Sequence, residues 1–91
     1  MKVEISAAAR RDIQYLRRWL AGRSPDTAKR VSQTIVAAIA SLNQFPERGL
    51  SVRGDLRELI VPFGSAGSVL RYGIVADRVT IARVFHSLER R

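Results

Sequence analysis

The chain opens with a short stretch of alternating residues, in which Val3 and Ile5 lie between polar neighbours over positions 2–6. Alternation with a period of two is typical of a strand with one buried face. From Ala7 to about Ala21 the apolar residues recur at the period of a helix instead. The apolar positions of this helix are Ala9, Ile13, Leu16 and Leu20. The pattern therefore predicts a short strand followed by an amphipathic helix, which Ser6 caps.

A second helix is predicted after a short link. We expect Gly22 to end the first helix as a left-handed cap, Ser24 to cap the second and Pro25 to occupy its first position. The apolar positions keep the helical period as far as Phe45, and Pro46 stops the helix. These positions are Ala28, Val31, Ile35, Ala38, Ile39, Leu42 and Phe45. Because the link is short, the two helices should form an antiparallel hairpin.

Strand patterns fill the second half of the chain. Residues 46–55 combine Pro, Gly, Arg and Asp without a period and predict a loop. Three extended runs follow, from Leu56 to Val61, from Val69 to Val75 and from Val79 to Phe85, joined by a Gly64-Ser65-Ala66-Gly67 turn and a tight Ala76-Asp77 corner. This order predicts an α+β fold, in which the helical hairpin packs on one face of a small, mainly antiparallel sheet. The length indicates a single domain, residues 1–91.

The other face of this sheet has no predicted cover. Arg71 alternates with the apolar Leu70 and Tyr72, and Arg83 has apolar neighbours on both sides, so the last strands are apolar on more than one face. Two helices are enough to cover only one face of such a sheet. We therefore expect an exposed apolar face fringed by arginine, a kind of surface that usually marks a binding site.

Composition narrows the function classes. The 91 residues hold 16 Lys and Arg against 8 Asp and Glu, a net charge of +8, so an acidic partner is expected. The chain has no cysteine and one histidine, His86, and its acids are scattered, so we expect no disulfide, no metal site and no cofactor. No run approaches the ~20 apolar residues of a membrane span, and positions 1–6 lack the apolar core of a signal peptide. We expect a cytoplasmic protein without membrane contact.

Basic residues of the strand half are the candidates for chemistry. Arginine can neutralise the charge that develops on a scissile phosphate, and histidine can move a proton, so Arg57, Arg83 and His86 are the parts of a metal-free ribonuclease. The same residues can bind a phosphate backbone or an acidic protein without any chemistry. The full set is Arg48, Arg53, Arg57, Arg71, Arg78, Arg83, His86, Arg90 and Arg91. Taken alone, these residues leave both alternatives open.

A series of short motifs resembles one known family over nearly the whole chain. The motifs are, in order, Ser24-Pro25-x-x-Ala28, Leu42-x-x-Phe45-Pro46, Gly49, Leu56-Arg57-Glu58-Leu59, Leu70-x-Tyr72 and Val84-Phe85-His86. In this order and spacing they resemble the ParE/RelE toxin superfamily of bacterial type II toxin–antitoxin modules. The Leu-Arg-Glu, Leu-x-Tyr and terminal histidine elements are closest to the ParE branch. The resemblance implies a two-helix hairpin on a small antiparallel sheet, in agreement with the order of elements above.

The resemblance also implies a toxin that a cognate antitoxin neutralises. Antitoxins of this superfamily typically lay a helix and an extended segment on the exposed apolar surface of the toxin, and we expect Arg57, Arg71 and Arg83 to contact the antitoxin here. ParE members act on DNA gyrase through their carboxyl-terminal segment, without being enzymes, and such modules are associated with plasmid stabilisation. The residues that this assigns to target contact are Phe85, His86, Arg90 and Arg91.

RelE members of the superfamily instead cut mRNA in the ribosomal A site with a set of basic residues. The sequence departs from that set, because residues 46–55 hold no lysine, Ser68 or Val69 stands where an arginine is expected, and no tyrosine follows Tyr72. These departures count against mRNA cleavage, although other basic residues would supply charge. The first hypothesis is therefore a ParE-like gyrase inhibitor. The alternatives are a RelE-like ribosome-dependent endoribonuclease and an inactive relative that only binds its antitoxin.

Overall fold

The computed structural model describes residues 1–63 and 66–86, and its order of elements is the predicted one with one strand added. The elements are β1 (Lys2–Ile5), α1 (Ala7–Ala21), α2 (Pro25–Ser41), β2 (Leu50–Arg53), β3 (Leu56–Phe63), β4 (Ala66–Val75) and β5 (Arg78–His86). The five strands form one sheet in the order β1-β5-β4-β3-β2. Strand β1 is parallel to β5 and the other neighbours are antiparallel, which confirms the predicted α+β fold.

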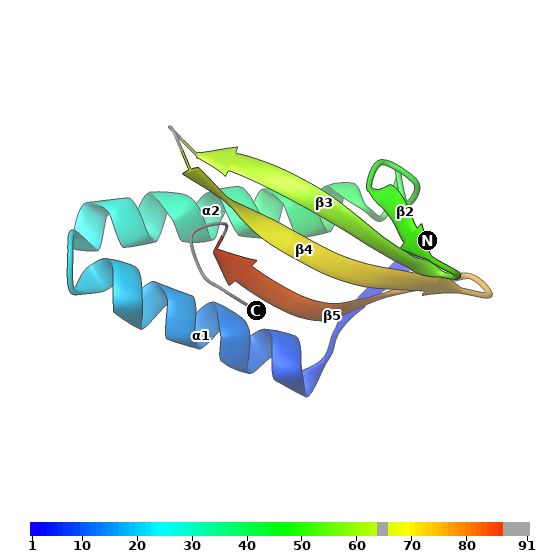
Figure 1. Cartoon of the computed structure of the whole chain (residues 1–91), viewed down its shortest axis with the longest axis horizontal. Coiled ribbons are helices and arrows are strands. Elements are labelled where there is room, and N and C mark those ends of the chain that lie inside the picture. The colour runs from blue at the N-terminus through cyan, green and yellow to red at the C-terminus, as the bar shows by residue number, and fades with distance from the viewer. Residues whose placement is uncertain (64–65, 87–91) are drawn as a thin grey trace.

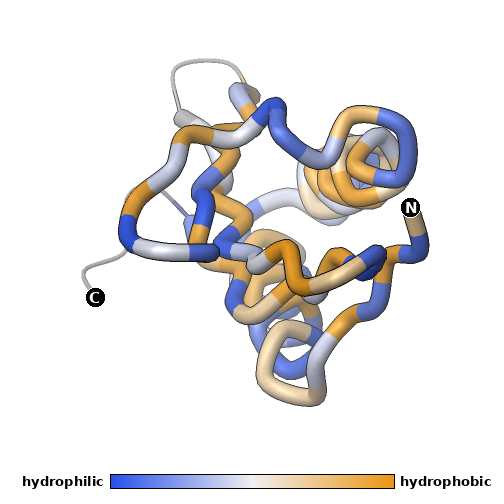
Figure 2. Tube along the Cα trace, turned by 90° about the vertical axis from the view of Figure 1, so that its right-hand side faces the viewer, coloured by the Kyte–Doolittle hydropathy of each residue, from blue (hydrophilic) through white to orange (hydrophobic). Residues whose placement is uncertain are grey.

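The two helices lie on one face of the sheet, and no described element lies over the opposite face of β3, β4 and β5 (Figure 1). The core between the layers is built from the apolar stripes predicted for both helices and from the inward side chains of the strands. Its fully buried members include Leu16, Ile35, Leu42, Leu70 and Ile81. Figure 2, which looks along the helices, shows hydrophilic and hydrophobic segments alternating along the strands, as expected where one face of a sheet is buried.

The predicted starts of both helices are confirmed by their caps. The Ser6 hydroxyl accepts a hydrogen bond from the amide of Ala9 at 3.0 Å, and the Ser24 hydroxyl accepts one from the amide of Thr27 at 3.2 Å. The predicted left-handed cap at Gly22 is wrong, because its φ is −65°. The amide of Ser24 instead donates to the carbonyl of Leu20 at 2.8 Å, so the chain enters the second helix through right-handed backbone.

The end of α2 was predicted too late. The helix ends at Ser41, and Phe45 is 61% exposed, so it does not extend the buried stripe. The end is held by a contact distant in sequence: the Asn43 side-chain amide donates to the Met1 carbonyl at 2.6 Å, and the Met1 ammonium donates to the Asn43 carbonyl at 2.7 Å. The chain therefore leaves the helix one turn before Pro46, where the amino terminus meets it.

Strand β2 lies inside the segment predicted as a loop, which is a correction to the predicted order. Leu50 and Val52 alternate with Ser51 and Arg53, but the run is only four residues long and all four residues are exposed, so neither face of the strand is buried. It forms because its backbone pairs with β3, where Leu50 lies opposite Glu58 and Ser51 opposite Arg57. Gly54, with a φ of +54°, turns the chain back into β3.

The three later strands are longer than predicted. Strand β3 continues through Pro62 to Phe63, because β2 pairs with it only as far as Glu58 and proline is tolerated at a sheet edge. Strands β4 and β5 extend to Ala66 and His86. The predicted turn between β3 and β4 begins with Gly64 and Ser65, which lie outside the described residues. The Ala76-Asp77 corner is confirmed, with Ala76 at a positive φ of 57°.

Candidate functional site

The open face of the sheet carries a row of apolar side chains, here called the outer row and made of Ile60, Val69 and Phe85. These residues lie directly opposite one another across β3, β4 and β5. The Ile60 residue is 65% exposed, and Val69 and Phe85 are half-buried. Because both helices lie on the other face, the outer row is uncovered by any described element (Figure 1). The predicted exposed apolar face is therefore confirmed for these strands.

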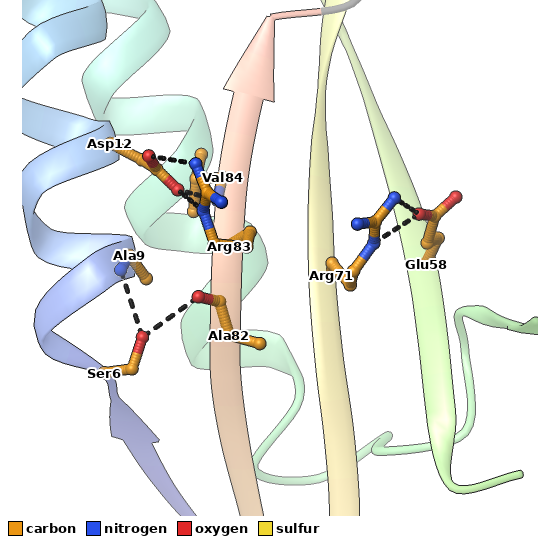
Figure 3. Close-up of polar contacts among 8 residues, drawn as sticks. All are labelled: Ser6, Ala9, Asp12, Glu58, Arg71, Ala82, Arg83 and Val84. Carbon is orange, nitrogen blue, oxygen red and sulfur yellow. Dashed lines mark hydrogen bonds and ion pairs between the residues drawn. The ribbon is translucent and has the colours of Figure 1, made fainter. Parts of the chain in front are cut away.

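One arginine lies on this face beside the outer row. The Nε atom of Arg71 donates to Glu58 Oε2 at 2.7 Å and its Nη2 atom lies 2.6 Å from the same oxygen (Figure 3). The Arg71 guanidinium also lies 5.3 Å from the centre of the Phe85 ring, a cation–π distance. A carboxylate and a ring thus hold this guanidinium over the apolar row. Arg71 was expected to contact the antitoxin, and its partner Glu58, which lies directly opposite across the strands, was not predicted.

A second arginine joins the sheet to the first helix. The Nε and Nη2 atoms of Arg83 donate to the two carboxylate oxygens of Asp12 at 2.7 and 3.0 Å (Figure 3). The Asp12 Oδ2 atom also accepts from the amide of Val84 at 2.9 Å, and the carboxylate is only 10% exposed. The hydrogen bonding of Arg83 to the Asp12 side chain raises the pKa of Arg83 above its usual value, and the negative charge of Asp12 is the second cause of this rise. Arg83 therefore remains a cation bound to α1.

A β-bulge in β5 accompanies this arrangement. Tyr72 pairs with Ile81 and Arg71 pairs with Arg83, so Ala82 is the extra residue of the bulged strand. The carbonyl of Ala82 accepts a hydrogen bond from the Ser6 hydroxyl at 3.0 Å (Figure 3). Because of the extra residue, Ile81 and Val84 both reach the core although they are three positions apart.

Asp12 was missed by the sequence reading, although the sequence held a signal for it. The residue falls three after Ala9 and four before Leu16, both of them buried, and so lies on the core face of α1. An acid on such a face needs a cationic or amide partner, because burying an unpaired charge is costly. What the sequence does not contain is the identity of that partner, more than seventy positions away.

The third candidate arginine, Arg57, contacts the backbone of the segment before β2. Its Nη1 atom donates to the carbonyls of Gly49 at 2.7 Å and Glu47 at 3.2 Å. Beside it the Tyr72 hydroxyl donates to the Pro46 carbonyl at 2.7 Å and accepts from the Gly49 amide at 2.9 Å. Arg57 and Tyr72 together fix the path of residues 46–49 against the sheet.

His86 lies on the buried side of the last strand. It is only 6% exposed, and its ring centre is 5.3 Å from that of Trp19 on α1. The guanidinium of Arg23 lies over the same indole, 4.6 Å from its centre. Phe85, the residue before His86, belongs to the outer row on the opposite face of the sheet. Of the residues assigned to target contact, Arg90 and Arg91 lie outside the described residues.

The three residues named for a ribonuclease do not meet in one place. Arg57 pairs with Tyr72 on β4, whereas His86 pairs with Ser68 on β4. Tyr72 and Ser68 are four residues apart on β4, which corresponds to about 13 Å along the strand. Strands β3 and β5 are two strand spacings apart, which adds about 10 Å across the sheet. Arg57, Arg83 and His86 have separate contacts, respectively with backbone carbonyls, Asp12 and Trp19. Among residues 1–63 and 66–86 no cluster of three or more His, Cys, Asp or Glu is placed to hold a metal ion.

Comparison with known families assigns this hairpin-on-sheet protein to the toxins of type II toxin–antitoxin modules. A family model described as the ParE toxin of the type II toxin–antitoxin system parDE matches residues 3–91, and the chain belongs to this family. None of the helices in the described part of the chain is long and apolar enough to cross a membrane.

Relatives and a solved structure agree with this assignment. Two relatives from Caulobacter vibrioides are Toxin RelE3, 45% identical over 98% of this chain and 97% of its own, and Toxin RelE1, 39% identical over 98% and 96%. The fold is similar to that of a chain in a structure titled "Chromosomal ParDE TA system from P. aeruginosa", with a TM-score of 0.76 over 93% of this chain and 94% of that chain. At 18% identity this likeness concerns the fold alone.

Proposed function

We propose that this toxin acts as a ParE-like inhibitor of DNA gyrase, by binding rather than by catalysis. The observation that carries the proposal is the separation of Arg57, Arg83 and His86. Metal-free cleavage of RNA needs a proton carrier and charge stabilisation close to one reacting phosphate. In this toxin the guanidinium of Arg57 already donates to the Gly49 carbonyl, and that of Arg83 already donates to Asp12. The arrangement favours a binding protein.

Target contact is assigned to the end of β5 and the residues that follow it. Phe85 faces outward in the outer row, and Arg90 and Arg91 add positive charge to the same end of the chain. His86 is buried against Trp19, so its part in the proposal is to hold the strand end that presents Phe85. Aromatic and arginine side chains are the residue types that contribute most to protein interfaces.

A cognate antitoxin is the partner of every type II toxin, and the proposal gives it the arginine-fringed part of the sheet. Arg71 contacts both Glu58 and the Phe85 ring, and the Arg83 side chain remains 43% exposed beside Asp12. An acidic segment laid along this face would meet both cations and cover the outer row. Arg57, which is 25% exposed, would add a contact at the far edge.

The names of the Caulobacter relatives favour a second candidate function, ribosome-dependent cleavage of mRNA, because they are called RelE toxins. The two functions predict opposite results with the same protein preparation. A gyrase inhibitor blocks supercoiling and accumulates cleaved DNA, while leaving ribosome-bound mRNA intact. A RelE-like nuclease cuts the mRNA and leaves gyrase active.

The decisive experiment is therefore a parallel assay of free toxin on gyrase with plasmid DNA and on ribosomes with a bound mRNA. Stabilised double-strand breaks in plasmid DNA, without A-site cleavage, support the proposal. Cleavage of the mRNA with unaffected supercoiling overturns it in favour of the nuclease. Activity in neither assay, together with normal growth on induction without antitoxin, indicates a relative that only binds its antitoxin.

A further inference from the structure

The exposed face of α1 carries positive charge that takes no part in the target and antitoxin contacts proposed above. Two arginine pairs lie on this helix, Arg10 with Arg11 and Arg17 with Arg18. All of these side chains are exposed, and none forms an ion pair with residues 1–63 or 66–86. The helix packs on the face of the sheet opposite the outer row (Figure 1). The arginine face is therefore a separate surface of the molecule.

The acid that α1 contains does not neutralise these arginines. The Asp12 carboxylate is only 10% exposed, and it is bound by Arg83 and by the amide of Val84. The other exposed positions of the helix are neutral, namely Ala7, Gln14, Tyr15 and Ala21. The exposed face of α1 thus presents guanidinium groups without a carboxylate between them.

The spacing of the arginines suits the two strands of a DNA duplex. Arg10 and Arg17 are seven residues apart, as are Arg11 and Arg18. Seven residues make close to two turns of helix, so the two pairs lie on the same side of α1, about 10.5 Å apart along its axis. The major groove of B-form DNA is about 12 Å wide. One pair can therefore reach the phosphates of one strand while the other pair reaches those of the second strand.

The chemistry of this face suits a phosphate backbone better than a protein surface. The centre of a protein interface is largely apolar, whereas Tyr15, 49% exposed, is the one large apolar side chain that α1 exposes. Tyr15 lies one turn after Arg11 and one turn before Arg18, and tyrosine hydroxyls and arginines both contact phosphate oxygens in protein–DNA interfaces. The fork of the guanidinium matches two phosphate oxygens at once.

We propose that the exposed face of α1 binds the phosphate backbone of duplex DNA, without reading its sequence. Duplex RNA fits less well, because the major groove of an A-form helix is deep and narrow. Gyrase acts on duplex DNA, so such binding would hold the toxin on the same molecule as its proposed target. The inference does not depend on that target, since binding is measured with toxin and DNA alone.

The test is the affinity of the full-length toxin, free of antitoxin, for a short fluorescently labelled DNA duplex of mixed sequence. Fluorescence anisotropy measures this affinity at salt concentrations between about 50 and 200 mM, where each neutralised phosphate contributes about −0.9 to the slope of log affinity against log salt. Contacts from both arginine pairs predict a slope of about −3.6 for the wild type.

The first variant, Arg10→Gln with Arg11→Gln, removes one of the two pairs. We expect about tenfold weaker binding and a slope less steep by about 1.8, because two phosphate contacts are lost. The matched control, Arg48→Gln with Arg53→Gln, removes the same charge at exposed positions just before and within β2. Strand β2 is three strand spacings from β5, about 14 Å, which exceeds the screening length of about 10 Å at 0.1 M salt. The control should therefore keep the wild-type slope.

Two conservative variants separate contact from charge and from folding. Arg10→Lys with Arg11→Lys keeps both positive charges and should keep the wild-type slope. Tyr15→Phe removes a hydroxyl without changing charge, so it should weaken binding by about two- to fivefold and leave the slope unchanged. Circular dichroism spectra that match the wild type show that the variants are folded.

The inference is overturned if the Arg48, Arg53 control loses as much affinity as the Arg10, Arg11 variant, because net charge alone would then explain binding. Affinity that does not change with salt, or tighter binding to an RNA duplex of the same sequence, also overturns it. Gyrase assays on the wild type separate this inference from the proposed function. A toxin that binds DNA through α1 but does not inhibit gyrase refutes only the proposed function, and one that inhibits gyrase without binding free DNA refutes only this inference.

Discussion

The buried carboxylate of Asp12 gives the sharpest test of how the two layers are held together. It accepts two hydrogen bonds from Arg83 and one from the amide of Val84, and Val84 is fully buried. Replacing it in Asp12→Ala leaves the amide of the buried Val84 without this acceptor. An orphaned buried donor costs about 1–3 kcal/mol. The Arg83 side chain, 43% exposed, regains hydration.

A change of about 2 kcal/mol should lower the melting temperature of a domain of this size by roughly 10 °C. Thermal and urea unfolding followed by circular dichroism measure this difference. The control is Glu4→Ala, which breaks the exposed ion pair with Arg78, 2.9 Å long and with side chains 42% and 54% exposed; an exposed pair of this kind contributes at most about 1 kcal/mol. If Asp12→Ala costs no more than Glu4→Ala, the carboxylate does not join the layers as argued here.

Three further predictions concern other parts of the molecule. In Gly49→Ala the new Cβ would lie 2.6 Å from the Tyr72 hydroxyl oxygen, so we expect a loss of about 1–3 kcal/mol in urea unfolding from overpacking; an unchanged midpoint would contradict the close approach. Leu42→Ala removes a fully buried side chain and should cost about 2–5 kcal/mol in the same measurement, and a smaller loss than for a half-buried leucine would show that this residue is not central to the core. Arg90→Ala with Arg91→Ala should abolish growth arrest on induction while leaving antitoxin affinity unchanged, and equal loss of both would show that the tail is structural.

The two cationic regions of the protein differ in how their charges are used. On the sheet, Arg57, Arg71 and Arg83 are each bound by carboxylates or carbonyls of the protein itself. On the helical hairpin, Arg17 of α1 and Lys29 of α2 have no ion pair among the described residues. A partner that binds the sheet must therefore compete with or extend existing contacts. A partner that binds the hairpin meets cations that have no ion pair with residues 1–63 or 66–86.

Local patterns in the sequence determined most of the architecture. The apolar stripes of the two helices, the caps at Ser6 and Ser24 and the alternation along the last three strands depend on neighbours a few positions away. Those signals were enough to predict the order of all elements except β2, the α+β layers and the open apolar face. They also carried the motifs that resemble the toxin superfamily.

The remaining features depend on contacts between separate elements of the chain, and only the tertiary structure decided them. Strand β2 has no buried side chain and forms because the edge of β3 supplies backbone partners. The end of α2 follows from the contact of Asn43 with Met1. The bulge at Ala82 redirects β5, and Arg83 is bound by Asp12 from the first helix. In each case the stabilising hydrogen bonds join two separate segments, and the pattern within one segment does not identify its partner.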